Sequence, residues 1–152
     1  MDLDDNETVL AAAEFLKDLD ETQRRLLAFS SERVTHQEGA VLYRARAISE
    51  GAHVLISGVL EARGESGETT RVFEEPGALL AAMSLIVAKP RPVTLVARTK
   101  SETLFIPRTA FMKLVRSYPD LAGRLAEQVR KELSEYIRTL RPLRSRLLRD
   151  GE

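Results

Sequence analysis

Short β-prone runs separated by glycines occupy the chain from Glu32 to Gly77. In order they read RVTH, AVLYR, HVLIS, VLEAR and TTRVF, and the turns around them contain Gly39, Gly51, Gly58, Gly64 and Gly67. Two more such runs, PVTLVAR and ETLFIP, follow before the chain reaches Arg108. Strands this short, each followed closely by a turn, are typical of an antiparallel sandwich, roll or barrel. The middle of the chain therefore predicts an antiparallel β-structure.

Helical patterns flank this β-rich segment. The residues from Val9 to Leu16 predict a short helix with one apolar face, and Asp20 with Gln23 forms a capping-box pattern at the start of a second helix. After Pro107 the run RTAFMKLVRSY predicts a short helix, and Pro119 suits the first turn of a longer one. The expected fold class is mainly β with flanking α: an antiparallel β-roll with N-terminal helices and a long C-terminal helix. At 152 residues we expect one domain, with helices and roll over 1–117 and the helical arm over 118–149.

A long apolar stripe follows Pro119. Its members recur every three or four residues, as on one face of a helix, and are Leu121, Leu125, Val129, Leu133, Tyr136, Ile137, Leu140 and Leu143. Pro142 predicts a kink or an end of this helix near Leu140. Because the stripe is longer than a small β-roll can cover, we expect a homodimer whose seam runs from Leu121 to Leu140. The alternative is that the stripe packs only on its own domain.

The composition argues against several functional classes. Lysine plus arginine equals aspartate plus glutamate, 23 each, so no overall positive field attracts nucleic acid. We interpret the cluster of arginines near the C-terminus as a solvated helix face and expect no specific DNA binding. The chain contains no cysteine, begins with the acidic stretch MDLDDNE and has no apolar run near the ~20 residues of a membrane span. We therefore expect a cytoplasmic protein without a membrane partner.

Motifs for catalysis are missing from the sequence. The only histidines, His36 and His53, stand well apart and form no H-x-H pair, so each is interpreted as an ordinary strand residue and not as a metal ligand. The sequence contains no G-x-S-x-G elbow, no phosphate loop G-x-x-x-x-G-K-[ST] and no H-E-x-x-H. We therefore predict no enzymatic activity and no metal site.

An arginine between two prolines is the strongest candidate for a binding residue. In GALLAAMSLIVAKPRPVTLVA, Arg91 follows an apolar run and precedes a β-prone one. A guanidinium held in this way can present its planar fork to a phosphate, although a loop arginine is more often simply solvated. The tripeptide alone does not decide between these interpretations.

Taken together, these segments resemble the cyclic-nucleotide-binding domain of catabolite activator (Crp/Fnr) regulators, of cAMP-dependent kinase regulatory subunits and of nucleotide-gated channels. The resemblance covers about Val9 to about Leu143. It is carried by EGAVLYRARAISEGAHVLISGVLEA, with glycines at the family's structural positions, and by FMKLVRSYPDLAGRLAEQVRKEL, which is similar to its last short helix and dimerisation helix. The resemblance implies a jelly-roll fold and a regulatory role.

The family's phosphate cassette reads roughly F-G-E-L-A, a variable stretch, then P-R-S/A-A-S/T. Laid over it without a gap, Leu80, Ala81 and Ala82 take the Phe, Gly and Glu positions. In the family the glutamate accepts a hydrogen bond from the ribose 2′-hydroxyl, which Ala82 cannot do. The glycine lets the backbone approach the sugar, and Ala81 adds a methyl group there.

The second half of the cassette is also altered. Arg91 matches the family's arginine, but Pro92 and Val93 take the next two positions, and Pro92 lacks the N–H that serves the phosphate. The base-contacting positions of the long helix fall at Tyr136 and Ile137, of which Tyr136 could stack on a purine. Each lost hydrogen bond to a charged group costs ~1.5–3 kcal/mol, so we expect cyclic-nucleotide binding to be weak or lost.

Three functional hypotheses remain at this point. The first is a non-enzymatic regulatory or sensor module with weak or no cyclic-nucleotide binding. The second is a working cAMP or cGMP receptor, or a receptor for another small anion, anchored by Arg91. The third is an interaction subunit for a protein partner, with a vestigial pocket filled by Leu80 and Met83. The chain stops at Glu152, before the helix-turn-helix that family transcription factors carry, and a truncated regulator would end in the same way.

Overall fold

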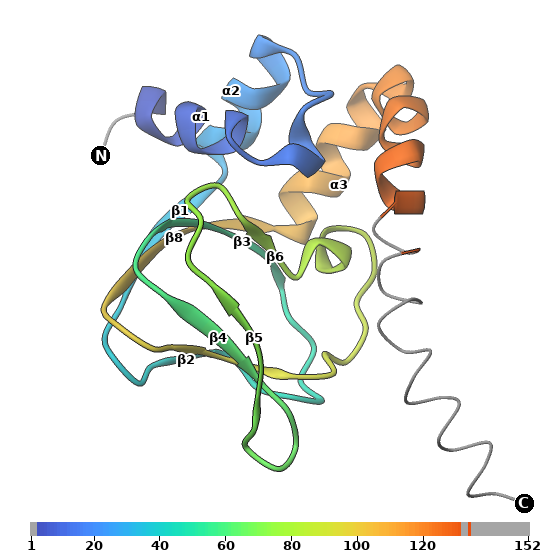
Figure 1. Cartoon of the computed structure of the whole chain (residues 1–152). Coiled ribbons are helices and arrows are strands. Elements are labelled where there is room, and N and C mark those ends of the chain that lie inside the picture. The colour runs from blue at the N-terminus through green and yellow to red at the C-terminus, as the bar shows by residue number, and fades with distance from the viewer. Residues whose placement is uncertain (1–2, 132–133, 135–152) are drawn as a thin grey trace, which may run out of the picture.

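A layer of helices lies above two antiparallel sheets in the computed structural model, which describes residues 3–131 and 134 (Figure 1). One four-stranded sheet has the order β1 (Glu32–His36), β8 (Ser101–Pro107), β3 (Gly51–Ser57), β6 (Leu79–Leu80). The other has the order β2 (Val41–Tyr43), β7 (Thr94–Ala97), β4 (Leu60–Arg63), β5 (Thr69–Phe73). All the paired strands are antiparallel. The predicted fold class, a β-roll with flanking helices, is confirmed.

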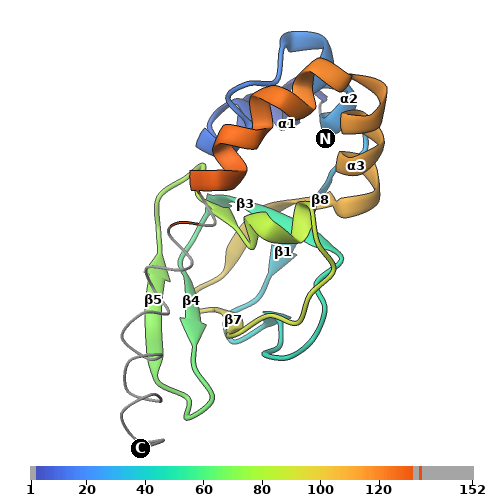
Figure 2. The same ribbon diagram turned by 90° about the vertical axis from the view of Figure 1, so that its right-hand side faces the viewer.

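Most of the helices come from the two ends of the described chain, and one 3-10 turn follows β6 (Figures 1 and 2). They are α1 (Leu3–Ala11), the 3-10 turn η1 (Glu14–Leu16), α2 (Glu21–Phe29), the 3-10 turn η2 (Ala82–Leu85) and α3 (Arg108–Ser117). Residues 119–131 form a further helix. The capping box is confirmed, since the Asp20 side chain accepts from the Gln23 N–H and the Gln23 side chain accepts from the Asp20 N–H.

The prediction of one helix from Val9 to Leu16 was wrong. The first helix begins at Leu3 and ends at Ala11, and η1 is a separate turn. Asp5 is exposed in the first turn of α1, where its negative charge favours a helix start through the helix dipole. The sequence interpretation gave more weight to the apolar residues and so placed the helix too late.

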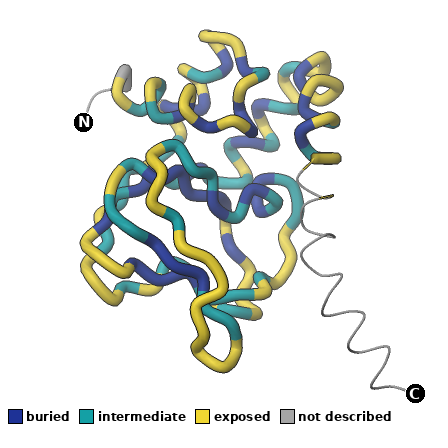
Figure 3. Tube along the Cα trace, viewed as in Figure 1, coloured by how far each residue is buried: buried dark blue, intermediate teal, exposed yellow. Residues whose placement is uncertain are grey.

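Two apolar clusters hold the layers together. Figure 3 shows buried segments in both the helical layer and the sheets. The larger cluster joins the helices to one face of the first sheet, through strand residues such as Val54 and Leu104. The smaller cluster lies between the two sheets and contains Leu55, Leu60 and Leu95. Neighbours Val54 and Leu55 belong to different clusters because successive side chains of a strand point to opposite faces. The first sheet is therefore buried on both sides.

Two of the predicted structural glycines allow close backbone approach. A Cβ added to Gly51 would lie 2.0 Å from the carbonyl oxygen of Ile106, on the paired strand β8. Gly58 has φ +92°, and a Cβ there would lie 2.6 Å from the Lys100 carbonyl oxygen. Both contacts are far shorter than real Cβ contacts, so larger side chains would force the strands apart. The glycine pattern thus reflects the close pairing of the strands.

The first half of the C-terminal stripe packs on the domain itself. Leu121 is 0% exposed, Leu125 is 4% exposed, and Val129 packs against the larger cluster. Leu133, Tyr136, Ile137, Leu140, Pro142 and Leu143 lie outside the described residues. No helix within residues 3–131 is long and apolar enough to cross a membrane.

Candidate functional site

The first part of the cassette turns from strand into 3-10 helix. Leu80 ends β6 and is 2% exposed within the cluster between the sheets. Ala82 begins η2 and is 6% exposed, but it belongs to the larger cluster beneath the helices. Both side chains are apolar and buried. The position that matches the family's ribose-binding glutamate therefore presents only a buried methyl group.

Between them, Ala81 adopts a left-handed backbone conformation. Its φ is 62° and its ψ is 39°, values that glycine reaches easily and alanine does not. The Ala81 carbonyl oxygen accepts a hydrogen bond from the Ser84 N–H at 2.8 Å, which closes the first turn of η2. The backbone at Ala81 thus has a conformation that favours glycine, the residue with which the resemblance aligns it.

Replacing Ala81 by glycine should raise the free energy of unfolding by about 1 kcal/mol, because it removes the left-handed strain. Urea denaturation followed by circular dichroism measures this change. The matched control is Ala110→Gly, at the third residue of α3, where the same substitution should lower stability by up to about 1 kcal/mol. A loss of stability from Ala81→Gly would contradict the assignment of strain to this residue.

Arg91 is held firmly by its backbone. Its N–H donates to the Ala47 carbonyl oxygen at 3.0 Å, and its own carbonyl oxygen accepts from the Arg46 N–H at 2.7 Å. The neighbouring Pro90 forms an isolated β-bridge with Ile48. These contacts tie the P-R-P segment to the loop before β3, so Arg91 is not a freely solvated loop residue.

The Arg91 side chain reaches the cassette helix. Its Nη1 donates to Ser84 Oγ at 3.1 Å, and Ser84 is 1% exposed within η2. The Ser84 carbonyl oxygen in turn accepts from Arg108 Nη1 at 3.1 Å, at the first residue of α3. Ser84 therefore connects the arginine of the cassette to the helical layer.

The positive charge of Arg91 has no acidic partner in residues 3–131: no ion pair there links it to a carboxylate. Its Nε is buried and makes no hydrogen bond. Its Cζ lies 5.9 Å from the centroid of the Tyr43 ring. Burial raises the pKa of the Tyr43 phenol, and the nearby Arg91 charge partly offsets this rise, so the phenol is neutral at pH 7. A guanidinium with a buried, unpaired N–H is suited to bind an anion.

The remaining predicted site residues do not contribute polar contacts around Arg91. Pro92 is exposed and Val93 is half-buried, and neither side chain has a group that could hydrogen-bond to a ligand. Tyr136 lies outside the described residues. The structure thus brings together Leu80, Ala81, Ala82 and Arg91 around η2.

The sequence analysis missed three residues of this site: Ser84, Tyr43 and Arg108. Ser84 could have been singled out, because it is the only polar residue from Ala78 to Ala88.

The two histidines, which are well apart in the sequence, lie close together in space. Their ring centroids are 5.8 Å apart, and His36 Nε2 and His53 Nδ1 each lie 3.0 Å from the hydroxyl of Thr103. Thr103 is 0% exposed, and His53 pairs with Leu80 of the cassette. Burial, with a smaller contribution from His36, lowers the pKa of His53 to about 4. Burial also lowers the pKa of His36.

This pair joins β1, β3 and β8 through one hydroxyl group. At pH 7 both rings are neutral, and each can donate to or accept from Thr103. Within the described residues, no group of three or more His, Asp or Glu side chains is placed to hold a metal ion. The buried His53 and the half-buried His36 thus form a hydrogen-bonded element of the roll.

Residues 33–118 match the sequence model of the family described as "Cyclic nucleotide-binding domain", which is more than half of the 152-residue chain. The chain therefore belongs to the cyclic nucleotide-binding domain family. A comparison with curated protein sequences finds no match.

Solved structures agree with this assignment. A cyclic nucleotide-binding-like protein from Brucella abortus is 29% identical, with a TM-score of 0.65 over 74% of this chain and 98% of that one. The sensor domain of the transcriptional regulator DNR from Pseudomonas aeruginosa is 20% identical, with a TM-score of 0.74 over 89% and 93%. The regulatory domain of Toxoplasma gondii PKA, crystallised with cAMP, is 18% identical, with a TM-score of 0.67 over 83% of this chain and 50% of that one. At 20% and 18% identity, the last two similarities show only that the fold is shared.

Proposed function

We propose that this chain is a non-enzymatic regulatory module of the cytoplasm whose cyclic-nucleotide site has weak or no affinity for cAMP and cGMP. The observation that carries the proposal is the pair Ala81 and Ala82, which keeps the backbone turn of the cassette but offers the ribose no acceptor. Pro92 removes a further donor beside Arg91. A ligand bound here would have to rely on Arg91 for most of its polar contacts.

Arg91 favours a second candidate, a receptor for a different small anion. Its charge has no carboxylate partner among residues 3–131, and its Nε is buried without a hydrogen bond. A vestigial site would be expected to neutralise or solvate such a group, since an unsatisfied buried donor costs about 1–3 kcal/mol. The retained charge therefore supports anion binding more than the hypothesis of a purely structural subunit.

A thermal-shift measurement tests the first proposal. Ligand binding stabilises a protein by RT ln(1 + [L]/Kd), so roughly 1 mM cAMP or cGMP with a millimolar Kd should raise the Tm by only about 1–2 °C. A functional receptor with micromolar affinity would instead show a rise of roughly 8 °C or more. A shift of that size would count against weak or lost binding.

We further propose a homodimer formed through the distal half of the C-terminal stripe. Leu121 and Leu125 are already buried on their own domain, so they are not free to form a seam. The remaining apolar positions, Leu133, Ile137 and Leu140, keep the spacing of a two-helix contact. The seam is therefore expected to begin near Leu133, later in the sequence than the expected start at Leu121.

The substitution Leu133→Glu should convert the dimer into a monomer, because it places two like charges in a two-fold seam. Sedimentation velocity at micromolar concentration measures the change, and circular dichroism confirms that the β-roll remains. Lys131→Glu is the matched control two positions earlier in the sequence, since Lys131 is exposed. A wild-type protein that sediments as a monomer would show that the stripe serves only its own domain.

A further inference from the structure

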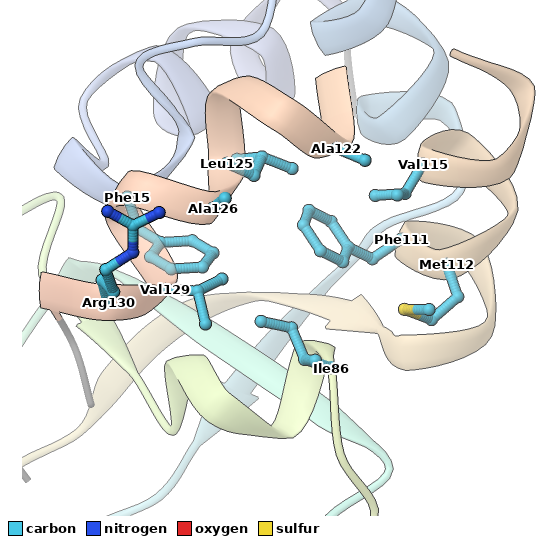
Figure 4. Close-up of a pocket in the computed structure, with 10 residues that line it drawn as sticks. All are labelled: Phe15, Ile86, Phe111, Met112, Val115, Ala122, Leu125, Ala126, Val129 and Arg130. Carbon is cyan, nitrogen blue, oxygen red and sulfur yellow. The ribbon is translucent and has the colours of Figure 1, made fainter. Parts of the chain in front are cut away.

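A cavity lies in the helical layer, and Arg91 is not among its lining residues. Its volume is about 360 Å³. It is enclosed by η1, the residue after η2, α3 and the helix of residues 119–131 (Figure 4). Phe15, Phe111 and Ile86 come from three different elements, and their side chains point toward a common space. None of the candidate cassette residues lines this cavity, so it is a separate site.

The walls of the cavity are almost entirely apolar. Nine of the ten lining residues are hydrophobic, and Arg130 is the exception. Phe15, Phe111 and Leu125 are at most 4% exposed, so the floor belongs to the folded core. Ala122 and Ala126 stand one helical turn apart on one wall, and their short side chains leave the space open. An apolar cavity of ~150 Å³ can take up benzene, so this one has room for a larger apolar group.

The dimensions favour an elongated ligand. From Ala122 to Arg130 the helix rises by roughly 12 Å at 1.5 Å per residue. With C–C bonds of ~1.5 Å, an extended chain of roughly ten carbons covers the same length. A pocket of this kind, mostly apolar with one charged group at its end, is typical of small-molecule sites.

The charge at the end of the cavity favours an anionic head group. Arg130 Nη1 pairs with Glu127 Oε2 at 3.2 Å, and both side chains are about three-quarters exposed, at 74% and 76%. An exposed pair of this kind contributes little to stability, so Arg130 can exchange Glu127 for a carboxylate of a ligand. No other charged side chain lines the cavity.

We propose that this cavity binds a medium-chain fatty acid, or a similar apolar monocarboxylate, with its chain between α3 and the helix of residues 119–131 and its carboxylate at Arg130. Burial of the chain supplies most of the affinity, at roughly 25 cal/mol per Å² of apolar surface. Arg130 selects the carboxylate over a neutral head group. This site is independent of the cyclic-nucleotide site, because Arg91 plays no part in it.

Titration calorimetry of the full chain with decanoate, far below micelle formation, tests the proposal. We expect saturable binding of one decanoate per chain. The variant Ala126→Leu fills the cavity and should weaken binding at least tenfold. Gly123→Leu is the control, because it adds the same side chain to the same helix at a position where a Cβ meets nothing within 4 Å. Should Ala126→Leu fail to fold by circular dichroism, Ala122→Leu fills the same space from the neighbouring turn.

The head-group preference is tested separately. Arg130→Gln should weaken decanoate binding several-fold and leave decanol binding unchanged, whereas Arg124→Gln, an exposed arginine of the same helix, should change neither. No saturable binding of decanoate to the wild type would overturn the proposal, as would equal binding by Ala126→Leu and Gly123→Leu. If a second copy of the chain covers the cavity, sedimentation will show a dimer that excludes decanoate, and this result also overturns it.

Discussion

The double variant Ala81→Gly with Ala82→Glu should bind cAMP roughly ten- to a hundredfold more tightly than the wild type. Glutamate at position 82 supplies the missing acceptor for the ribose 2′-hydroxyl, and a hydrogen bond to a charged group contributes ~1.5–3 kcal/mol. Glycine at position 81 removes the methyl group from a backbone that already has the left-handed conformation. Titration calorimetry with cAMP measures the gain.

The same double variant should be less stable to unfolding than the wild type. Ala82 is 6% exposed and packs in the larger apolar cluster, so a carboxylate there must leave that packing or be partly desolvated. The single variant Ala81→Gly is the control, and without an acceptor it should gain little affinity. If the double variant folds but binds cAMP no more tightly than the wild type, the pocket is blocked, and the loss of polar partners alone does not explain the weak binding.

Folding stability should fall by about 3 kcal/mol as the pH is lowered from 7 to 4, through the titration of His53 alone. The pKa of His53 is lowered from 6.5 to about 4, so the unfolded chain binds a proton first. The stability from the neutral ring is therefore fully present above pH 6.5 and is lost progressively toward pH 4. His36 and Thr103 face this ring, and protonation of both histidines would place two positive charges beside one hydroxyl group.

The variant His53→Asn separates this effect from the titration of carboxylates such as Glu61, whose pKa is lowered mainly by its hydrogen bond to Arg63. Urea denaturation of both proteins between pH 7 and pH 4 gives the difference. The wild type should lose about 3 kcal/mol more than His53→Asn. If the free energy of unfolding falls equally with pH in the two proteins, His53 is not responsible for the pH dependence.

Much of the fold could be predicted because its signals are local. A short β-prone run next to a glycine depends on neighbouring residues alone, and the capping box of Asp20 and Gln23 spans a single turn. The close approach of Gly51 to Ile106 explains why that glycine position is recognisable. The N-terminal helix was misplaced because α1 begins among polar residues such as Asp5 and Asn6, which the apolar pattern does not include.

The contacts that shape the candidate site could not be predicted in the same way. His36 and Thr103 are brought together by strand pairing between residues far apart in the chain, so the sequence separation of His36 from His53 was misleading. The hydrogen bond from Arg91 to Ser84 depends on where η2 lies against the roll. Only the resemblance to a family could align Ala81 and Ala82 with a ligand, and the left-handed φ of Ala81 now supports that alignment.

Titration calorimetry of the wild-type chain with cAMP and cGMP, beside the variant Arg91→Gln, tests most directly whether the family's site is still functional. We predict dissociation constants of roughly 0.1 mM or weaker for both nucleotides, because the ribose acceptor and a phosphate donor are missing. Any residual binding should disappear in Arg91→Gln, since the guanidinium is the one charged group of the cassette that remains. Sub-micromolar binding of either nucleotide to the wild type would contradict the proposed loss of affinity.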